Sequence, residues 1–371
     1  MSKPFTTIAI TLAAAAVAAG AASRQPRISN GAVATQPAGT PFAQSFRTLV
    51  DSVSDVAWIG YAVPAVDGER SMCCFDSGTT FVSGSVVMSD GSACCGFCRL
   101  EPSAGGSGST ARPAQPSVVR LEAPELMVVL FRVAARRIDR VRVFSEDCEL
   151  DAGGRPVTWL QNVRPADSVA LLESLAAGST ERRDRIVDGA IAGIALHRDD
   201  AADAALERLV APGQPEHVRA KVPFWLGNSR GGRGPAALKR LLAQDTSEEV
   251  RKKTVFGISQ SQEPDAVDTL IHAARTHATA RVRGEAIFWL GQKAGSKAAA
   301  AITERIDNDP ETDVKKKAVF ALSQLPKDEG VPLLITVART HTNPAVRKQA
   351  MFWLGQSKDP RAIDVFAEIL K

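Results

Sequence analysis

The chain has 371 residues, enough for two domains of ordinary size, and 44% of them are hydrophobic, so each domain can bury a core. Its formal net charge is only +4, from 45 basic and 41 acidic residues, so no overall field would concentrate nucleic acid or an anionic membrane surface. The composition therefore argues against a disordered chain and against a nucleic-acid partner.

The first 22 residues have the order of a secretory signal. Lys3 precedes a weakly apolar run from Ile8 to Ala19, and small residues and Arg24 follow it. The run is shorter than the roughly 20 apolar residues that a membrane span needs, so we expect residues 1–22 to be cleaved rather than to anchor the chain. No later segment is long and apolar enough to cross a bilayer. The sequence thus predicts an exported protein, periplasmic or secreted.

The next two segments differ in composition and in the pattern of their apolar residues. Residues 23–45 are rich in Ala, Pro, Gly, Thr and Gln without periodicity, which predicts a flexible leader. Residues 46–163 contain short apolar runs separated by Gly, Ser and Pro, which predicts a small β-rich domain. Its clearest strands are expected where β-branched and aromatic residues cluster, at Val118–Glu122, Leu126–Val133 and Ile138–Phe144, with a hairpin turn at Ala134–Arg137.

All the cysteines fall in this β-rich region. They are Cys73, Cys74, Cys94, Cys95, Cys98 and Cys148. Disulfides persist in an oxidising compartment, so an exported chain makes all six disulfide candidates.

Two alternatives to disulfides stay open. The spacing approximates the two ligand pairs of a thiolate zinc site, formed by Cys73, Cys94, Cys95 and Cys98. Reduced or redox-active thiols, with Cys95 and Cys98 as the pair, are the other alternative. Adjacent cysteines rarely bind one metal together, so we favour disulfides and predict neither a metal nor a cofactor.

From residue 164 to residue 371 the apolar spacing becomes helical and the chain repeats itself. A valine recurs every 32 residues and is followed each time by Arg or Lys: Val218, Val250, Val282, Val314 and Val346. Six residues after each valine stands a phenylalanine: Phe224, Phe256, Phe288, Phe320 and Phe352. A fixed period of this size is typical of a solenoid. A degenerate first repeat is expected around Ile186.

A second apolar series keeps the same period, so each unit is predicted to be helix, turn, helix. Its members are Leu206, Leu238, Leu270, Ile302, Leu334 and Phe366. The predicted fold class is therefore α+β, with a small N-terminal β-rich domain followed by an α-α superhelix of five clear repeats and one degenerate repeat.

The repeat pattern Val-Arg-x-x-Ala-x-x-x-Leu-Gly, followed by a short turn and a second amphipathic helix, resembles the HEAT-like repeats of the phycobilisome-lyase type. The resemblance covers roughly residues 180–371 and implies a solenoid of the HEAT/armadillo type, but it is poor evidence for function. The front half, with Trp58-Ile59-Gly60-Tyr61 and the cysteine pairs, is similar to N-terminal regions of uncharacterised exported bacterial HEAT-repeat proteins.

Helical geometry assigns faces to the repeat. At about 100° per residue, positions 0, 4, 7 and 8 counted from each valine form the packed face. Position 7 alternates between large and small residues: Trp225, Gly257, Trp289, Ala321 and Trp353. We predict that each indole packs over the missing side chain of the adjacent repeat, and that the repeating unit is a pair of 64 residues.

The phenylalanines at position 6 fall largely away from the packed face. They are flanked by the lysines Lys252, Lys316 and Lys348 and by the amides Gln260, Gln292, Gln324 and Gln356. Stacked repeats would align them into an apolar stripe edged by positive charge, which suits a peptide or an acidic protein. The alternative is that the rings tuck between first helices or lie under the N-terminal domain.

Motifs for catalysis are sparse. None of the five histidines precedes a glutamate, so neither a zincin pair nor the iron-binding His-Glu pairs of HEAT-repeat deoxyhypusine hydroxylases have a match. Gly227-Asn228-Ser229-Arg230-Gly231 spells a nucleophile elbow but falls in a turn between helices. We predict a non-enzymatic binding or scaffolding protein of the cell envelope with an unidentified protein partner. The alternative is an oxidoreductase or a thiol-redox enzyme.

Overall fold

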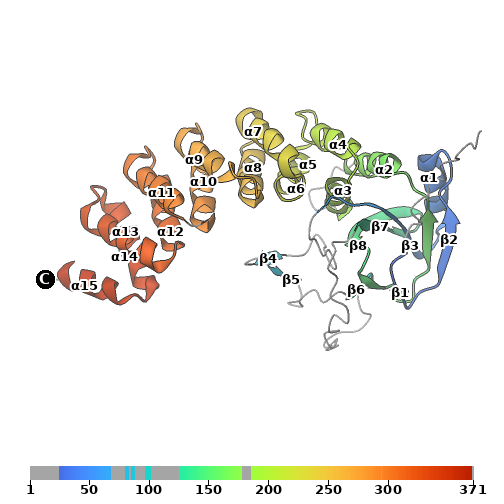
Figure 1. Cartoon of the computed structure of the whole chain (residues 1–371), viewed down its shortest axis with the longest axis horizontal. Coiled ribbons are helices and arrows are strands. Elements are labelled where there is room, and N and C mark those ends of the chain that lie inside the picture. Colours follow the sequence, from blue (N-terminus) through green and yellow to red (C-terminus); the bar gives the residue numbers. More distant parts are fainter. Residues whose placement is uncertain are drawn as a thin grey trace, which may run out of the picture.

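The computed structural model describes residues 25–67, 80–82, 85–87, 97–101, 125–177, 185–293 and 295–369. A small sheet domain stands at one end, and an arch of helical hairpins runs from it to the C-terminal end (Figure 1). The predicted fold class, a small β-rich domain followed by an α-α superhelix, is confirmed. The segment predicted as a signal and the strand predicted at Val118–Glu122 lie outside the described residues.

The larger sheet has five strands in the order β2-β10-β3-β7-β8. Their bounds are β2 Val33–Pro37, β10 Val157–Gln161, β3 Val56–Pro64, β7 Leu126–Ala134 and β8 Arg137–Ser145. β3, β7 and β8 form an antiparallel meander, whereas β10 lies parallel to both β2 and β3. The two strands and the hairpin turn predicted between residues 126 and 144 are confirmed.

The prediction of a flexible leader at residues 23–45 is wrong for its described part. β2 pairs along its whole length with β10, and α1 (Phe42–Ser52) buries Phe42, Phe46 and Val50 against the sheet. The side chains of β2 are mostly exposed, so its sequence shows no apolar alternation. Backbone hydrogen bonds rather than side-chain burial therefore hold this strand at the edge of the sheet.

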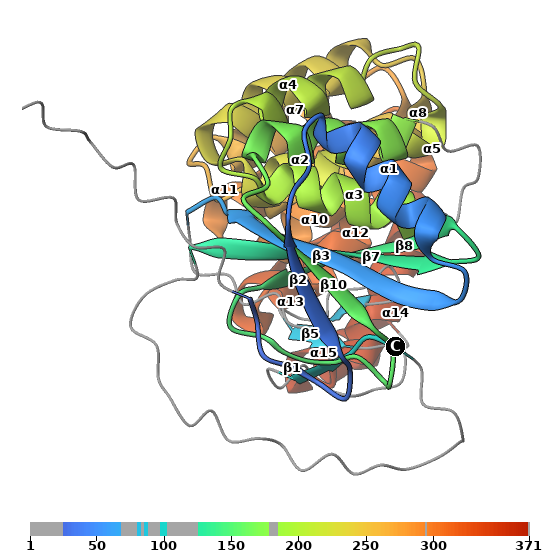
Figure 2. The same ribbon diagram turned by 90° about the vertical axis from the view of Figure 1, so that its right-hand side faces the viewer.

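The two faces of the sheet carry separate apolar clusters because successive side chains of a strand point to opposite faces. Ile59, Tyr61 and Phe131 face α1, α2 (Pro165–Ala177) and α3 (Arg185–Leu196). Figure 2 shows these helices over one face of the sheet. Trp58 and Trp159 belong to the cluster on the opposite face.

That opposite face is covered by a second sheet of three short strands, β1 (Ile28–Ser29), β9 (Glu149–Asp151) and β6 (Phe97–Arg99). Cys98 and Cys148 lie in the cluster between the sheets, exposed by only 2% and 1%, and each of the two is disulfide-bonded. The other four cysteines are outside the described residues, so their participation in disulfides stays a prediction. The hairpin of β4 (Thr80–Val82) and β5 (Ser85–Val87) is separate.

The sheet domain and the helical array share one core. α3 approaches β8 so closely that a Cβ on Gly189 would lie 2.1 Å from the carbonyl oxygen of Val141. The apolar cluster under the sheet continues without a gap from Phe42 to Ala362. The boundary predicted at residue 163 falls in the turn before α2, but it does not separate two cores.

The helices after α3 pair into successive hairpins. Their bounds are α4 Ala201–Leu209, α5 Glu216–Arg219, α6 Val222–Ser229, α7 Gly234–Gln244, α8 Glu248–Gln260, α9 Ala266–Thr276, α10 Ala280–Lys293, α11 Ser296–Asn308, α12 Thr312–Ser323, α13 Lys327–Thr340, α14 Pro344–Ser357 and α15 Pro360–Ile369. The first helices α6, α8, α10, α12 and α14 line the inner side of the arch, and the second helices form its outer side (Figure 1). In the described part, no helix has the length and apolarity to cross a membrane.

Candidate functional site

The phenylalanines of the first helices form a column along the inner side of the arch. The rings of Phe224 and Phe256 stack with centroids 5.7 Å apart and planes 16° apart, and those of Phe288 and Phe320 stack at 6.0 Å and 8°. The predicted alignment of equivalent side chains by the repeat therefore holds in three dimensions.

Two tryptophans close the gaps between the stacked pairs. Trp289 lies 4.7 Å from Phe256 and 4.9 Å from Phe288, and Trp353 bridges Phe320 and Phe352 at 4.8 and 5.0 Å. We call the five phenylalanines with Trp289 and Trp353 the aromatic column. It is continuous from α6 to α14, and the sequence analysis had not placed the tryptophans in it.

The predicted packing of the indoles over small residues is corrected by these contacts. Each indole of the column lies against the phenylalanine of the preceding first helix. The small residue instead allows two backbones to approach, because a Cβ on Gly257 would lie 2.2 Å from the carbonyl oxygen of Pro223. The large-small alternation is real, and its cause is close helix packing.

The aromatic column is partly exposed. Phe224, Phe256, Phe288 and Phe320 are half-buried, and Phe352 at the end of the array is 53% exposed. The rings thus combine the two predicted arrangements, the exposed stripe and the rings tucked between first helices. They pack between first helices and still reach the surface.

The charges beside the column are mixed rather than positive. A pocket of about 230 Å³ opens over Phe256 and Trp289, and Glu249, Lys252 and Glu285 contribute to its lining. Lys252 pairs with Glu249 at 3.1 Å, and Glu285 accepts a hydrogen bond from the indole N–H of Trp289 at 2.9 Å. The predicted positive edge is therefore partly neutralised here.

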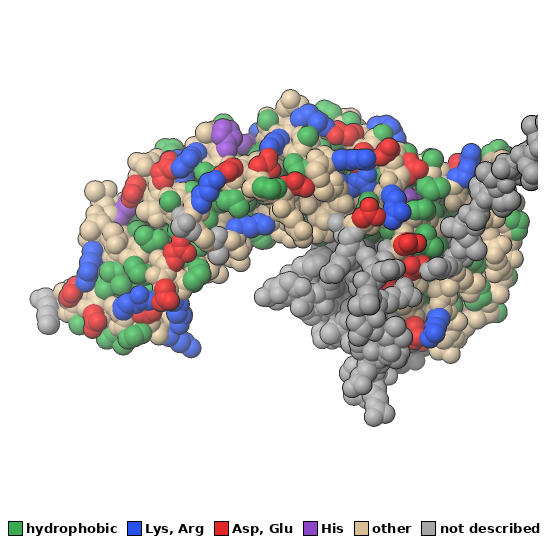
Figure 3. All heavy atoms as spheres, viewed as in Figure 1, with side chains coloured by type: hydrophobic (Ala, Val, Ile, Leu, Met, Phe, Trp, Pro, Cys, Tyr) green, Lys and Arg blue, Asp and Glu red, His purple; other side chains and the backbone are tan. Residues whose placement is uncertain are grey.

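The other flanking residues of the prediction lie along the same side. Lys316 pairs with Asp313 at 3.4 Å, whereas Lys348 is exposed and forms no ion pair with another described residue. Gln260 and Gln324 donate to the hydroxyl of the preceding serine at 3.1 Å, and Gln292 and Gln356 are exposed. Figure 3 shows acidic and basic side chains interspersed over the array, so no single-sign field dominates that face.

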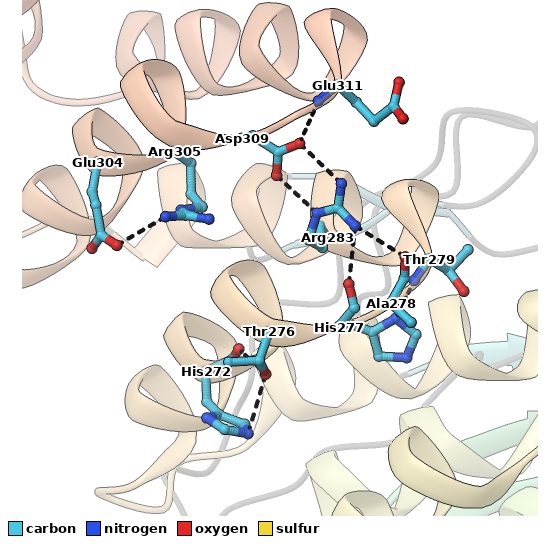
Figure 4. A network of polar contacts seen from close by, with 10 residues as sticks. All are labelled: His272, Thr276, His277, Ala278, Thr279, Arg283, Glu304, Arg305, Asp309 and Glu311. Atoms are coloured by element: carbon cyan, nitrogen blue, oxygen red, sulfur yellow. Dashed lines mark hydrogen bonds and ion pairs between the residues drawn. The ribbon is translucent and has the colours of Figure 1, made fainter.

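Buried ion pairs hold successive hairpins together. Arg283 forms two hydrogen bonds with Asp309, at 2.8 and 2.9 Å, and two more with the carbonyl oxygens of His277 and Ala278 (Figure 4). Burial alone would raise the pKa of Asp309, but Arg283 and the amide of Glu311 hold it below its ordinary value. Arg219 and Asp245 form the equivalent pair two repeats earlier.

Alternate repeats replace this aspartate with histidine. His277 and His341 accept a backbone hydrogen bond from Thr279 and Asn343 at 3.1 and 3.0 Å. Burial and the charge of Arg251 lower the pKa of His277. The alternation supports the predicted pair of repeats as the structural unit, and both histidines close turns.

A Ser–His contact that the sequence analysis missed lies where the sheet meets the array. Ser168 Oγ is 2.9 Å from His197 Nε2 and 2.7 Å from the hydroxyl of Tyr61. All three residues are fully buried, so a substrate has no access to them. Burial and the charge of Arg230 lower the pKa of His197 to about 3. We assign these residues a structural role at the junction.

No three His, Cys, Asp or Glu side chains among the described residues are grouped as a metal site requires. Ser229, the serine of the elbow-like motif, ends α6 and is buried. Among the described residues, the aromatic column is the feature that offers a surface for contact.

Comparison with known proteins finds HEAT repeats in the C-terminal part of the array. A family model for HEAT repeats matches residues 235–323 and 299–371. A search of curated proteins found no match.

Three solved structures are similar to the chain. CpcE and CpcF of phycocyanin lyase from Nostoc sp. PCC7120 are 22% identical, covering 42% of this chain and 99% of that chain, with a TM-score of 0.33. Human deoxyhypusine hydroxylase with glycerol is 19% identical, covering 55% and 90%, with a TM-score of 0.25. YibA of E. coli is 19% identical, covering 55% and 75%, with a TM-score of 0.33. At these TM-scores the similarities carry no inference about function.

Proposed function

We propose, from the premise that this chain is a HEAT-repeat protein, that it is a non-enzymatic binding protein which holds an extended polypeptide segment along the aromatic column. The observation that carries the proposal is the continuity of the column across five first helices while its rings stay partly exposed. A contiguous apolar strip on a surface marks a contact site, and solenoids of this kind use extended inner surfaces for binding.

The mixed charges beside the column suit a polypeptide better than a polyanion. Glu249 and Glu285 lie beside Lys252 and Lys253 at the pocket over Phe256, so the lining carries no net positive charge to attract a nucleic acid. A peptide can place apolar side chains on the rings and polar groups against the flanking amides and charges.

We also propose that the protein acts outside the cytoplasm. Residues 1–22 have the order of a cleaved signal, and six cysteines in one domain suit an oxidising compartment. The oxidoreductase or thiol-redox alternative gains no support from Cys98 and Cys148, which are buried and disulfide-bonded.

Substitution of Phe352 tests the column directly, because its ring is 53% exposed and its replacement leaves the core intact. Peptides selected from a displayed random library should bind the native chain and lose at least tenfold in affinity for Phe352→Glu, measured by fluorescence anisotropy with unchanged melting temperature. Ile363→Glu is the matched control, since Ile363 is 68% exposed on α15, outside the column. Equal affinity for both variants and the native chain would refute the proposal.

A further inference from the structure

A second pocket, of about 200 Å³, lies between α12, α13 and α14 at the C-terminal end of the aromatic column. Its polar lining consists of Ser323, Gln324, Lys327, Trp353, Gln356 and Ser357, and the rest of the lining is apolar or glycine. None of the lining residues is acidic. Trp353 belongs both to this pocket and to the column, so a segment lying on the column reaches the pocket.

The lining offers hydrogen-bond donors that are not used within the described part. The indole N–H of Trp353 is shielded from solvent and has no acceptor there, which is a costly arrangement for a buried donor. Lys327 forms no ion pair with a described residue, and the amide of Gln356 is exposed. The hydroxyls of Ser323 and Ser357 are occupied, since they donate to carbonyl oxygens of their own helices at 2.6 and 2.7 Å.

The equivalent position one 64-residue unit earlier is occupied by the chain itself. The counterpart of Ser357 is Lys293, whose ammonium lies 3.5 Å from the carbonyl oxygen of Ser261, the counterpart of the lining residue Leu325. The counterpart of Trp353 is Trp289, whose N–H already has Glu285 as its acceptor.

The charge at one position of the lining is also reversed between the two units. Where the earlier unit has Glu263, the pocket has Lys327. The carboxylate of Asp359 is already held by Arg361 at 2.9 and 2.8 Å, which lowers its pKa, and Lys327 contributes least to that lowering. The change from Lys293 to Ser357 therefore opens space, and the change from Glu263 to Lys327 makes that space favourable to an anion.

We infer that this pocket binds a carboxylate group of the partner, with Trp353 and Gln356 as hydrogen-bond donors and Lys327 as the counter-ion. The inference rests on the proposed function, because the segment on the aromatic column delivers the carboxylate. A single lysine balances one negative charge, which favours a carboxylate over a phosphate dianion. The group is either an Asp or Glu side chain or the C-terminus of the partner chain.

The indole N–H resonance of Trp353, assigned with Trp353→Phe, reports directly on the pocket. Four dipeptides serve as probes: acetyl-Phe-Glu-amide, its neutral isostere acetyl-Phe-Gln-amide, acetyl-Phe-Ala with a free C-terminus, and acetyl-Phe-Ala-amide. We expect a saturable shift with at least one carboxylate probe, at least tenfold tighter than with its neutral counterpart. The tighter of the two carboxylate probes identifies the source of the group. Equal affinity for charged and neutral probes, or no shift at all, would overturn the inference.

Two variants separate this inference from the proposed function. Ser357→Met places a side chain of similar length to Lys293 in the pocket without adding a charge, and should remove the response to carboxylate probes by filling the space. Lys327→Gln leaves the space open and should weaken the carboxylate probes tenfold while leaving the neutral probes unchanged. It therefore remains a valid test of the inference if Ser357→Met lowers the melting temperature. If library-selected peptides bind the column but no probe shows a carboxylate preference, the pocket inference fails and the proposed function stands.

Discussion

At the scale of single residues, the buried ion pair of Arg283 and Asp309 holds successive hairpins together. Their side chains are exposed by only 9% and 0%, and the guanidinium also satisfies two carbonyl oxygens at the turn between α9 and α10. A buried pair of this kind adds little stability over an apolar pair of the same shape, but removal of one partner leaves a buried charge without compensation.

Replacement of Arg283 by Met should therefore lower the free energy of unfolding by about 3–5 kcal/mol. The neighbouring Arg281 provides the control, because it lies on the same helix with its side chain 78% exposed and pairs with Glu248 at 3.1 Å. Arg281→Met should cost about 0–1 kcal/mol. Urea denaturation of both variants measures the difference, and equal losses would contradict the assigned role of the buried pair.

At the scale of the element, the close contact of α6 with α8 depends on glycine. Gly257 faces the backbone of Pro223, and Gly227 faces the backbone of Gly257, where a Cβ would lie 1.8 Å from its carbonyl oxygen. The missing side chains bring the two first helices together, and this approach lets the rings of Phe224 and Phe256 stack.

Gly257→Ala should separate α6 from α8 and destabilise the array by about 1–3 kcal/mol, the usual cost of overpacking. Gly232→Ala is the matched control, since a Cβ there meets no atom within 4 Å. Differential scanning calorimetry should show a lower melting temperature for the first variant alone. An unchanged melting temperature for Gly257→Ala would show that α6 and α8 can accommodate the extra methyl group without strain.

The elements also show where prediction from sequence fails. The first helices carry a strong helical period of apolar residues, so their positions and their common register were predictable. β2 has no such pattern, because its side chains are exposed and its place in the sheet depends on hydrogen bonds to β10, which is more than 100 residues away in the chain. A single sequence contains no local signal for that pairing.

At the scale of the whole molecule, the sheet and the array are joined by a buried polar junction. His197 contacts Ser168 and pairs with Ala65 in an isolated β-bridge, and Arg230 donates to the carbonyl oxygen of His197 at 2.6 Å. With a pKa of about 3, His197 is neutral in the folded chain at pH 5, whereas the unfolded chain protonates it below about pH 6.5.

The unfolded state therefore binds more protons between pH 6.5 and 3, so stability falls as the pH is lowered through this range. His197 alone should account for about 2 kcal/mol of the loss between pH 6.5 and pH 5. His197→Gln should flatten the pH dependence of the unfolding free energy over that interval, measured by denaturant titration at each pH. His272→Gln, at an exposed site, should retain the native slope. Identical slopes for all three chains would show that the junction does not sense pH.

The sequence by itself determined the repeat, the hairpin of two helices in each unit and the alignment of the phenylalanines. A fixed period places equivalent side chains on equivalent faces. Only the tertiary structure decided that the rings are half-buried, that Trp289 and Trp353 complete the column, and that the sheet and the array share one core. The pocket at Ser357 belongs with these, since its space depends on how closely three helices approach. Such distances arise from the packing of residues far apart in the chain, and periodicity along the chain does not encode them.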